Sequence, residues 1–254
     1  MIKIKRLSAP EKLTEEVKKQ LTTEFKADKS KRVWNKPYIR ERLLEMSLHK
    51  CCYCEELLGP GHVEMHVEHY HDKSKYPEEV VEWDNLLPSC PYCNKKKSGH
   101  DTYQEPIVDP TKDDPKKLFY IKDYRYRSYD PSPTSLAKIT ISVLGLNDSN
   151  EKVFPRFLIG NKLIEELDML YESAVELGDN IIINTRKRNR IVNACSNLLK
   201  MCLRSSRFGA TMATVLHESD DYNKLRDLLS QYDLWDDDIE KLHQESLSIS
   251  LLKR

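Results

Sequence analysis

The sequence carries no net charge and contains no long apolar run. Its 41 basic side chains balance 41 acidic ones, which argues against a protein that coats nucleic acid with its whole surface. The longest purely aliphatic run, residues 181–183, is far too short to cross a membrane. The Met-Ile-Lys-Ile-Lys start lacks the apolar stretch of a secretory signal. We therefore expect a protein of the reducing cytoplasm, where disulfides are rare.

Charge is unevenly distributed along the 254 residues, which suffice for one large domain or two small ones. Basic side chains outnumber acidic ones by 14 to 7 in residues 1–50. Acidic side chains are in excess elsewhere, by 17 to 12 in residues 51–150 and by 17 to 15 in residues 151–254. Affinity for phosphate groups must therefore come from local patches, with the N-terminal arm as the leading candidate.

Four of the seven cysteines form two pairs of identical spacing. The pairs are Cys51-x-x-Cys54 and Cys90-x-x-Cys93. Each pair can point two thiolates at one tetrahedral ion, so together they predict a closed four-sulfur zinc site that acts as scaffold. The alternatives are ordinary buried cysteines or a redox pair. The other three are interpreted as a spare residue between ligands and two small core residues: Cys52, Cys195 and Cys202.

The segments around these pairs predict a β-β-α order. Hydrophobic spacing indicates helices over residues 10–25 and 37–48. Residues 62–70 alternate apolar and polar side chains, as a half-buried strand does, after a Gly-Pro-Gly turn at 59–61. Residues 72–89 suit a long loop, and residues 94–98 should begin a helix.

These residues match a known family. The runs KCCYC and VEHYHDKSKYPEEVVEWDNLLPSCPYCNKKKSG resemble the HNH endonucleases of the ββα-metal fold. Within them the sequence is similar to the PtuB branch, the nucleases of Septu-type and retron-associated anti-phage systems. The segments MIKIKRLSAPEKL, DPTKDDPKKL and TISVLGLN also look like that branch. The likeness covers roughly residues 1–150, and the C-terminal third matches no motif.

The resemblance implies a role for each polar residue of the motif. His69 would be the general base that takes a proton from the attacking water. Glu68 and Asn94 would hold one catalytic Mg²⁺, with Mn²⁺ as a substitute, because hard oxygen ligands favour these ions over zinc. Asn85 would hold the loop and fix the orientation of the imidazole. Glu68 and His69 are adjacent on a strand and point to opposite sides, so the strand must bend or end there.

Two positions depart from the usual letters of the motif. Asn94 stands in place of a histidine, and His71-Asp72 stand where a basic residue and a proline are expected. His71 and Asp72 could add a metal or phosphate contact. His66 lies two positions before Glu68 and either contacts the metal or fills the strand surface.

Other polar residues leave their alternatives open. His62 and His100 are interpreted as solvated turn residues. The lysines at 95–97 either follow a phosphate backbone from the first turn of the helix or form a solvated face. The run YIKDYRYRSY at 120–129 is an edge strand or a base-stacking surface.

The C-terminal third shows helical patterns. Residues 184–207 predict an amphipathic helix whose basic stripe is either solvated or a docking surface. The stripe comprises Arg186, Arg190, Lys200, Arg204 and Arg207. Residues 163–177 and 222–247 also repeat apolar residues at helical spacing, and Asp236-Asp237-Asp238 resembles a helix start.

Together these patterns predict a predominantly helical α+β protein with a structural zinc held by four cysteines, and the resemblance implies a treble-clef-like ββα-metal core around it. Four segments are expected. They are a basic N-terminal helical arm (1–50), the nuclease core (51–105), an extension of it (106–150) and a C-terminal helical region for partner docking (151–254).

The resemblance implies metal-dependent hydrolysis of DNA or RNA within an anti-phage defence system. It also implies a companion ATPase of the ABC or SMC-like, PtuA type, alone or within a retron complex. The alternative is a non-catalytic zinc module that binds nucleic acid or protein. Such a module would need the four cysteines but not Glu68, His69 and Asn94 together, so their joint presence favours catalysis.

Overall fold

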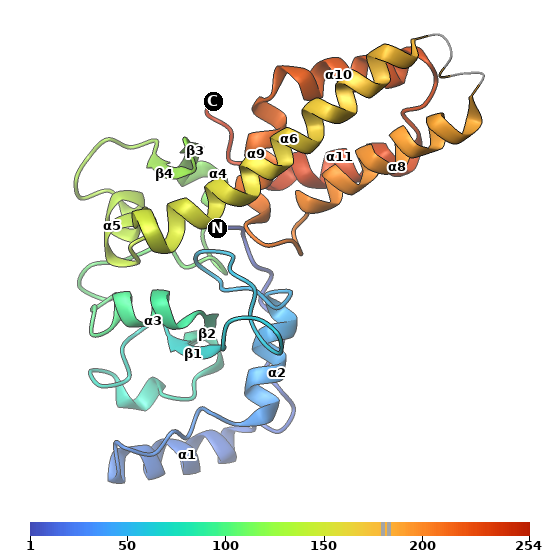
Figure 1. Ribbon diagram of the computed structural model, residues 1–254. Coiled ribbons are helices and arrows are strands. Elements are labelled where there is room, and N and C mark those ends of the chain that lie inside the picture. Colours follow the sequence, from blue (N-terminus) through green and yellow to red (C-terminus); the bar gives the residue numbers. More distant parts are fainter. Residues whose placement is uncertain (179–180, 182–183) are drawn as a thin grey trace. The chain divides into compact units, whose positions relative to one another are not determined.

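A computed structural model describes residues 1–178, 181 and 184–254 (Figure 1). Contacts divide the chain into two compact units, Met1–Phe119 with Tyr126–Asp148, and Tyr120–Arg125 with Ser149–Arg254. Helices predominate, as predicted, and the strands are short. In the described part of the chain, no helix combines the length and apolar character needed to span a membrane. Most of the aliphatic run at 181–183 lies outside the described residues.

The first unit combines short strands and helices. Its elements are α1 (Glu15–Ala27), α2 (Pro37–Met46), β1 (His66–His69), the 3-10 helices η1 (Pro77–Glu79) and η2 (Trp83–Asn85), β2 (Leu86–Ser89), α3 (Pro91–Lys97), α4 (Pro115–Leu118) and α5 (Leu136–Val143). The predicted helices before the first cysteine pair are therefore present as α1 and α2. The start of α1 was predicted too early, because Thr14 rather than Pro10 caps it by accepting a hydrogen bond from the Val17 amide at 3.3 Å.

Strands β1 and β2 pair antiparallel, with His66 opposite Ser89 and His69 opposite Leu86. Helix α3 follows β2 directly and packs against β1. The strand predicted over 62–70 is shorter, because only His66–His69 find partners in the four residues of β2.

Two further predictions in this region were wrong at their boundaries. The loop predicted over residues 72–89 ends in strand β2, whose four residues are all buried. The helix starts at Pro91 rather than Asn94 because Cys90 caps it, accepting a hydrogen bond from the Cys93 amide at 3.4 Å. Residues 95–97 therefore belong to the last turn of α3, not to its first.

The run YIKDYRYRSY forms parts of two strands rather than one edge strand. Strands β3 (Phe119–Lys122) and β4 (Arg125–Ser128) make a two-stranded sheet. Asp123 and Tyr124 close the turn between them with φ values of 51° and 60°, the left-handed conformation of a tight hairpin.

The second unit is a bundle of helices. It contains a π-helical turn (Ser149–Val153), α6 (Phe154–Leu177), α8 (Thr185–Met201), α9 (Gly209–Glu218), α10 (Asp220–Gln231) and α11 (Asp237–Ile249). Helix α6 contacts α8, α9 and α10, and α11 contacts α8 and α9. Seven of the ten residues of α9 are buried, including six in succession from Gly209 to Thr214, which identifies it as the core helix. The predicted C-terminal helices are thus confirmed, with Asp236 as the cap of α11.

Helix α8 has the predicted apolar side but is shorter than expected. Ile191, Cys195 and Leu198 are buried. The helix ends at Met201, where the Cys202 amide bonds back to the Leu199 carbonyl at 2.9 Å and tightens the last turn. Arg204 and Arg207, predicted on the same helical stripe, therefore lie beyond the helix.

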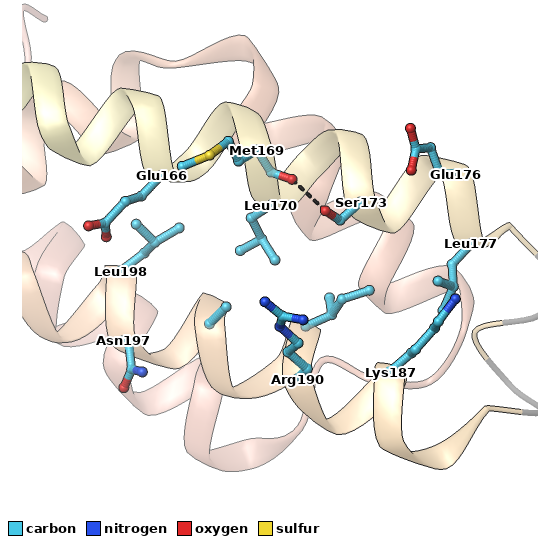
Figure 2. Close-up of a pocket in the computed structure, with 12 residues that line it drawn as sticks. Glu166, Met169, Leu170, Ser173, Glu176, Leu177, Lys187, Arg190, Asn197 and Leu198 are labelled. Carbon is cyan, nitrogen blue, oxygen red and sulfur yellow. Dashed lines mark hydrogen bonds between the residues drawn. The ribbon is translucent and has the colours of Figure 1, made fainter.

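A groove of about 590 Å³ runs between α6 and α8 (Figure 2). Its apolar lining includes Met169, Leu170 and Leu198. Glu166 and Glu176 line it from α6, and Lys187 and Arg190 line it from α8. The groove therefore presents an acidic wall, an apolar floor and a basic wall.

Candidate metal and catalytic site

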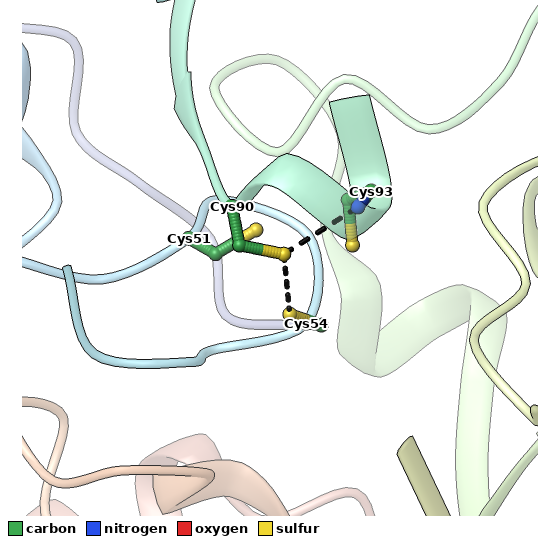
Figure 3. Close-up of side chains that lie close together, drawn as sticks. All are labelled: Cys51, Cys54, Cys90 and Cys93. Atoms are coloured by element: carbon green, nitrogen blue, oxygen red, sulfur yellow. Dashed lines mark hydrogen bonds between the residues drawn. The ribbon is translucent and has the colours of Figure 1, made fainter. Parts of the chain in front are cut away.

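Four buried cysteines meet in the first unit (Figure 3). They are Cys51, Cys54, Cys90 and Cys93, and their sulfur atoms all lie within 4.8 Å of one another. The Cys54 and Cys90 sulfurs are 3.6 Å apart. A tetrahedron with Zn–S bonds of about 2.3 Å has edges of about 3.8 Å, so the cluster can hold one zinc ion. The predicted four-sulfur site is therefore supported by geometry.

Local backbone structure builds both halves of this cluster. In the first half, the Cys51 amide bonds to the Glu56 carbonyl at 2.8 Å, and Glu55 turns the chain with a φ of 67°. The Cys52 amide bonds to the Pro88 carbonyl at 2.9 Å, which ties this turn to β2. The second half is the capped start of α3. A bound zinc ion would consequently lock the end of the β1–β2 ribbon to α3.

The remaining cysteines are core residues, as predicted. Cys52 is buried but does not belong to the four-sulfur group. Cys195 and Cys202 are buried in the second unit, and burial raises the pKa of the Cys195 thiol to about 12. Burial keeps the Cys195 and Cys202 thiols protonated at neutral pH.

Glu68 lies on the face of β1 that α3 covers. Its side chain is 5% exposed, and the Lys97 ammonium lies 2.7 Å from its Oε1 atom. Within the described residues this oxygen has no hydrogen bond of regular geometry. Burial raises the pKa of the carboxyl group, while Lys97 opposes that rise. Glu68 is therefore a buried carboxylate next to one internal cation.

Asn94 approaches the same face of β1 from α3. Its amide nitrogen donates a hydrogen bond to His66 Nδ1 at 3.1 Å. His66 and Glu68 share a face because side chains alternate along a strand. The contact with His66 uses the amide nitrogen of Asn94, so the hard ligand atom of this side chain is its amide oxygen.

His69 points to the other face of β1. Its Nε2 atom is 2.9 Å from the Val80 carbonyl, and its ring packs edge-on against Trp34 with centroids 4.9 Å apart. Burial, followed by the nearby Lys73 charge, lowers the pKa of the imidazole to about 3. The ring is therefore neutral at physiological pH, and the bond to Val80 leaves Nδ1 as the nitrogen able to accept a proton.

Asn85 holds the loop between the two strands in place through hydrogen bonds. Its Oδ1 accepts a hydrogen bond from the His71 amide at 2.6 Å. Its Nδ2 donates to the carbonyls of His71 and Glu79, both at 3.1 Å. The side chain thus joins the end of β1 to the segment that carries Val80, the hydrogen-bond partner of His69.

The comparison with protein-family models gave no match. The chain is, however, 40% identical over 242 residues to the Septu protein PtuB of Bacillus thuringiensis. The alignment covers 95% of this chain and 92% of the relative. The chain belongs to the PtuB family. Because the alignment spans nearly the whole chain, membership in the PtuB family extends past residue 150, where recognisable motifs end.

The sequence of this PtuB family member did not predict three residues that contact the motif. Lys97 is 3% exposed and contacts Glu68, so it is neither a solvated lysine nor one that can follow a phosphate backbone from the surface. Its spacing of three from Asn94 on a helix is the signal that could have placed both on one face. Trp34 and Val80, which contact His69, carry no sequence signal because both are distant from it along the chain.

Other candidate residues lie around this centre in different ways. His71 stacks on Tyr103 with ring centroids 3.7 Å apart, and its Nδ1 is 2.8 Å from Thr102 Oγ1. Asp72 accepts hydrogen bonds from Ser74. His62 is an exposed turn residue, as predicted. Lys95 and Lys96 are exposed in the last turn of α3, which is compatible with either role considered for them. His100 is less solvated than predicted, because its Nε2 lies 2.7 Å from the Glu105 carbonyl.

Proposed function

We propose that this chain is the nuclease effector of a Septu anti-phage system. In this proposal it hydrolyses phosphodiester bonds of nucleic acid with a divalent cation held by Glu68 and Asn94 and with His69 as general base. The observation that carries the proposal is the shared location of Glu68 and Asn94 at the contact between β1 and α3, next to the four-cysteine cluster. Likeness to a Septu protein supports the defence setting.

The donor atoms suit Mg²⁺ or Mn²⁺ better than a second zinc ion. A carboxylate and an amide oxygen are hard ligands, and Glu68 Oε1 is a buried oxygen without a regular hydrogen bond among the described residues. When bound, such a cation supplies Lewis-acid stabilisation of charge on phosphate oxygens. Glu68 and Asn94 would orient it, and α3 would keep the two ligands together.

The ring of His69 is neutral, as a general base must be, but burial lowers its pKa to about 3, so it becomes an effective base only once the side chain that covers it is displaced. The Val80 carbonyl holds Nε2, and Asn85 fixes the segment that carries Val80. The proton would go to Nδ1 and would then be lost to solvent. The imidazole is almost fully buried, so a substrate must displace a covering side chain before it reaches Nδ1. Lys73, whose ammonium lies 5.0 Å from the Trp34 ring centroid, is close enough to be that cover.

The rival function is a zinc module that binds nucleic acid or protein without cleaving it. The four-cysteine cluster is compatible with both functions. The rival gives no reason for Glu68 to be buried on the face of β1 that Asn94 and Lys97 of α3 approach. Whether the purified protein cleaves nucleic acid therefore decides between the two functions.

Cleavage is expected to require a divalent cation other than zinc. The purified chain, assayed with its ATPase partner, should cut DNA or RNA in Mg²⁺ and lose at least about 10³-fold of this rate without Mg²⁺, since a cation contributes several kcal/mol to transition-state stabilisation. Gel assays of both substrates, with zinc content measured on the same samples, provide the test. Undiminished cleavage in Mg²⁺-free buffer would exclude the proposed cation, and binding without cleavage would favour the zinc module.

We also propose a PtuA-type ATPase as the partner, with α6 as the docking surface. Of the large apolar side chains exposed in the described residues, five lie on α6. They are Phe154, Phe157, Leu158, Met169 and Val175. Exposed apolar side chains gathered on one helix mark an interaction site. Part of this surface borders the groove between α6 and α8, where opposite charges on the two walls would orient a bound helix.

Replacing Met169 by glutamate should weaken the complex with the ATPase by at least about tenfold, because a buried carboxylate without a partner is costly. Met169 is 60% exposed, so the change leaves the folded chain intact. Co-purification and titration of the two proteins measure the effect. Lys241→Glu, on an exposed position of α11, is the matched control and should bind normally. Equal binding by both variants would exclude this part of α6 as the docking surface.

A further inference from the structure

The last residue of α3, Lys97, has a buried ammonium group. Its side chain is 3% exposed, whereas Lys95 and Lys96 before it are exposed. The Lys97 Nζ atom lies 2.7 Å from Glu68 Oε1 and donates a hydrogen bond to the His69 carbonyl at 2.8 Å. One cation therefore touches both residues at the end of β1.

Lys97 and Glu68 are buried charges that depend on each other. Taking an ammonium or a carboxylate out of water costs several kcal/mol, and only a close opposite charge with further hydrogen bonds offsets that cost. The ion pair and the His69 carbonyl provide that compensation. Removing either charge alone would leave the other buried and uncompensated.

The ammonium also competes with a divalent cation for the same oxygen. A Mg²⁺ ion binds carboxylate oxygen at about 2.0–2.1 Å. With Nζ at 2.7 Å from Oε1, both cations on this oxygen would lie within about 4.8 Å of each other in a buried environment, where like charges repel strongly. Repulsion therefore favours withdrawal of the Lys97 ammonium from Oε1 when a divalent cation binds this oxygen.

We propose that Lys97 is an internal counter-cation of the Glu68 site. It holds Glu68 and the end of β1 in place when no divalent cation is bound, and it withdraws from Oε1 when one binds. This inference rests on the proposed function, because it assumes that Glu68 binds the cation. Lys97 is a positioning residue whose exchange with the cation lowers the affinity of the site for metal.

Mn²⁺ binding to the full-length, zinc-loaded protein tests the proposal without any activity assay. Calorimetric titration should show that Lys97→Met binds Mn²⁺ at least about fivefold more tightly than wild type, because the competing charge is gone. Lys97→Met should also unfold at a lower temperature without Mn²⁺ and regain stability when Mn²⁺ is added. Lys95→Met, which changes an exposed lysine of the same helix, should match wild type in both measurements. Any Mn²⁺ binding that remains in the Glu68→Gln variant occurs at other carboxylates.

The outcomes separate failure of this proposal from failure of the proposed function. Equal Mn²⁺ affinity in wild type and Lys97→Met, with binding lost in Glu68→Gln, would overturn the role of Lys97 and retain the cation site. Mn²⁺ binding that survives in Glu68→Gln would overturn the cation site itself.

If Lys97→Met folds poorly, its response to Mn²⁺ still tests the proposal. If the variant folds only with Mn²⁺, the cation replaces the ammonium and the proposal is supported. The double variant Glu68→Gln/Lys97→Met removes both charges and should fold without metal. If the double variant folds while Lys97→Met stays unfolded at saturating Mn²⁺, the cation does not replace the ammonium, and the proposal is wrong. If both variants stay unfolded, the shape of the lysine rather than its charge is required, which contradicts it equally.

Discussion

Replacing His69 by alanine is expected to reduce phosphodiester cleavage by about 10²- to 10⁴-fold, the usual contribution of a general base. The physical reason is the loss of the neutral ring nitrogen that would accept the proton of the attacking water. Rates of DNA and RNA cleavage in Mg²⁺ measure the effect. Zinc content and circular dichroism on the same samples should stay unchanged, because His69 does not belong to the four-cysteine cluster.

The buried position of His69 requires two further variants. Alanine leaves a cavity beside Trp34, so a loss of activity could reflect destabilisation. His69→Gln retains a side-chain N–H that can donate to the Val80 carbonyl and fills most of the space, yet it has no basic nitrogen. It should be as inactive as alanine and more stable. His62→Ala, in an exposed turn, should be fully active. Normal cleavage by His69→Gln would refute the assignment of His69 as the base.

Replacing Cys93 by serine is expected to unfold the first unit. A structural zinc ion contributes about 10–16 kcal/mol to the folding of small zinc modules, which is as large as the whole stability of a typical domain, about 5–15 kcal/mol. Wild type should contain one zinc per chain by metal analysis, and Cys93→Ser should contain little or none. Thermal unfolding and proteolysis should show loss of the first unit, with cleavage lost as a consequence of the fold.

Cys52→Ala is the matched control for this experiment. Cys52 is buried in the same turn but lies outside the four-sulfur group. The variant should keep one zinc and most of its stability, since it loses only a small buried side chain. A folded wild-type sample that contains no zinc would disprove the four-sulfur site, and so would a Cys93→Ser variant with full zinc content.

Local patterns along the chain predicted much of the helical framework. The amphipathic spacing in residues 184–207 gave the correct buried side of α8, and the repeats in residues 222–247 predicted helix, because a helix places residues three and four apart on one face whatever it packs against. The two Cys-x-x-Cys pairs predicted the sulfur cluster for a similar reason. Each turn orients two thiols locally, so only the meeting of the two turns depended on the fold.

Boundaries were less predictable where a contact from elsewhere decided them. The start of α1 follows from the Thr14 cap, whereas β1 is short because its partner strand has only four residues. The second strand of the expected β-β-α order was not placed within residues 72–89, because Leu86 and Leu87 lie between a 3-10 helix and Pro88, in a segment rich in charge and proline. Pairing with β1 stabilises that segment as a strand, and no alternation of apolar and polar residues within it predicts a strand.

The sequence by itself determined which side chains could carry chemistry: two sulfur pairs, a carboxylate next to an imidazole, and an amide directly after the last cysteine of the second pair. Only the tertiary structure decided their surroundings. It buried Lys97 against Glu68, covered His69 with Trp34, and left apolar residues of α6 exposed. Residue type and local spacing are properties of the chain, whereas burial and the partner of each charge depend on segments that meet only after folding.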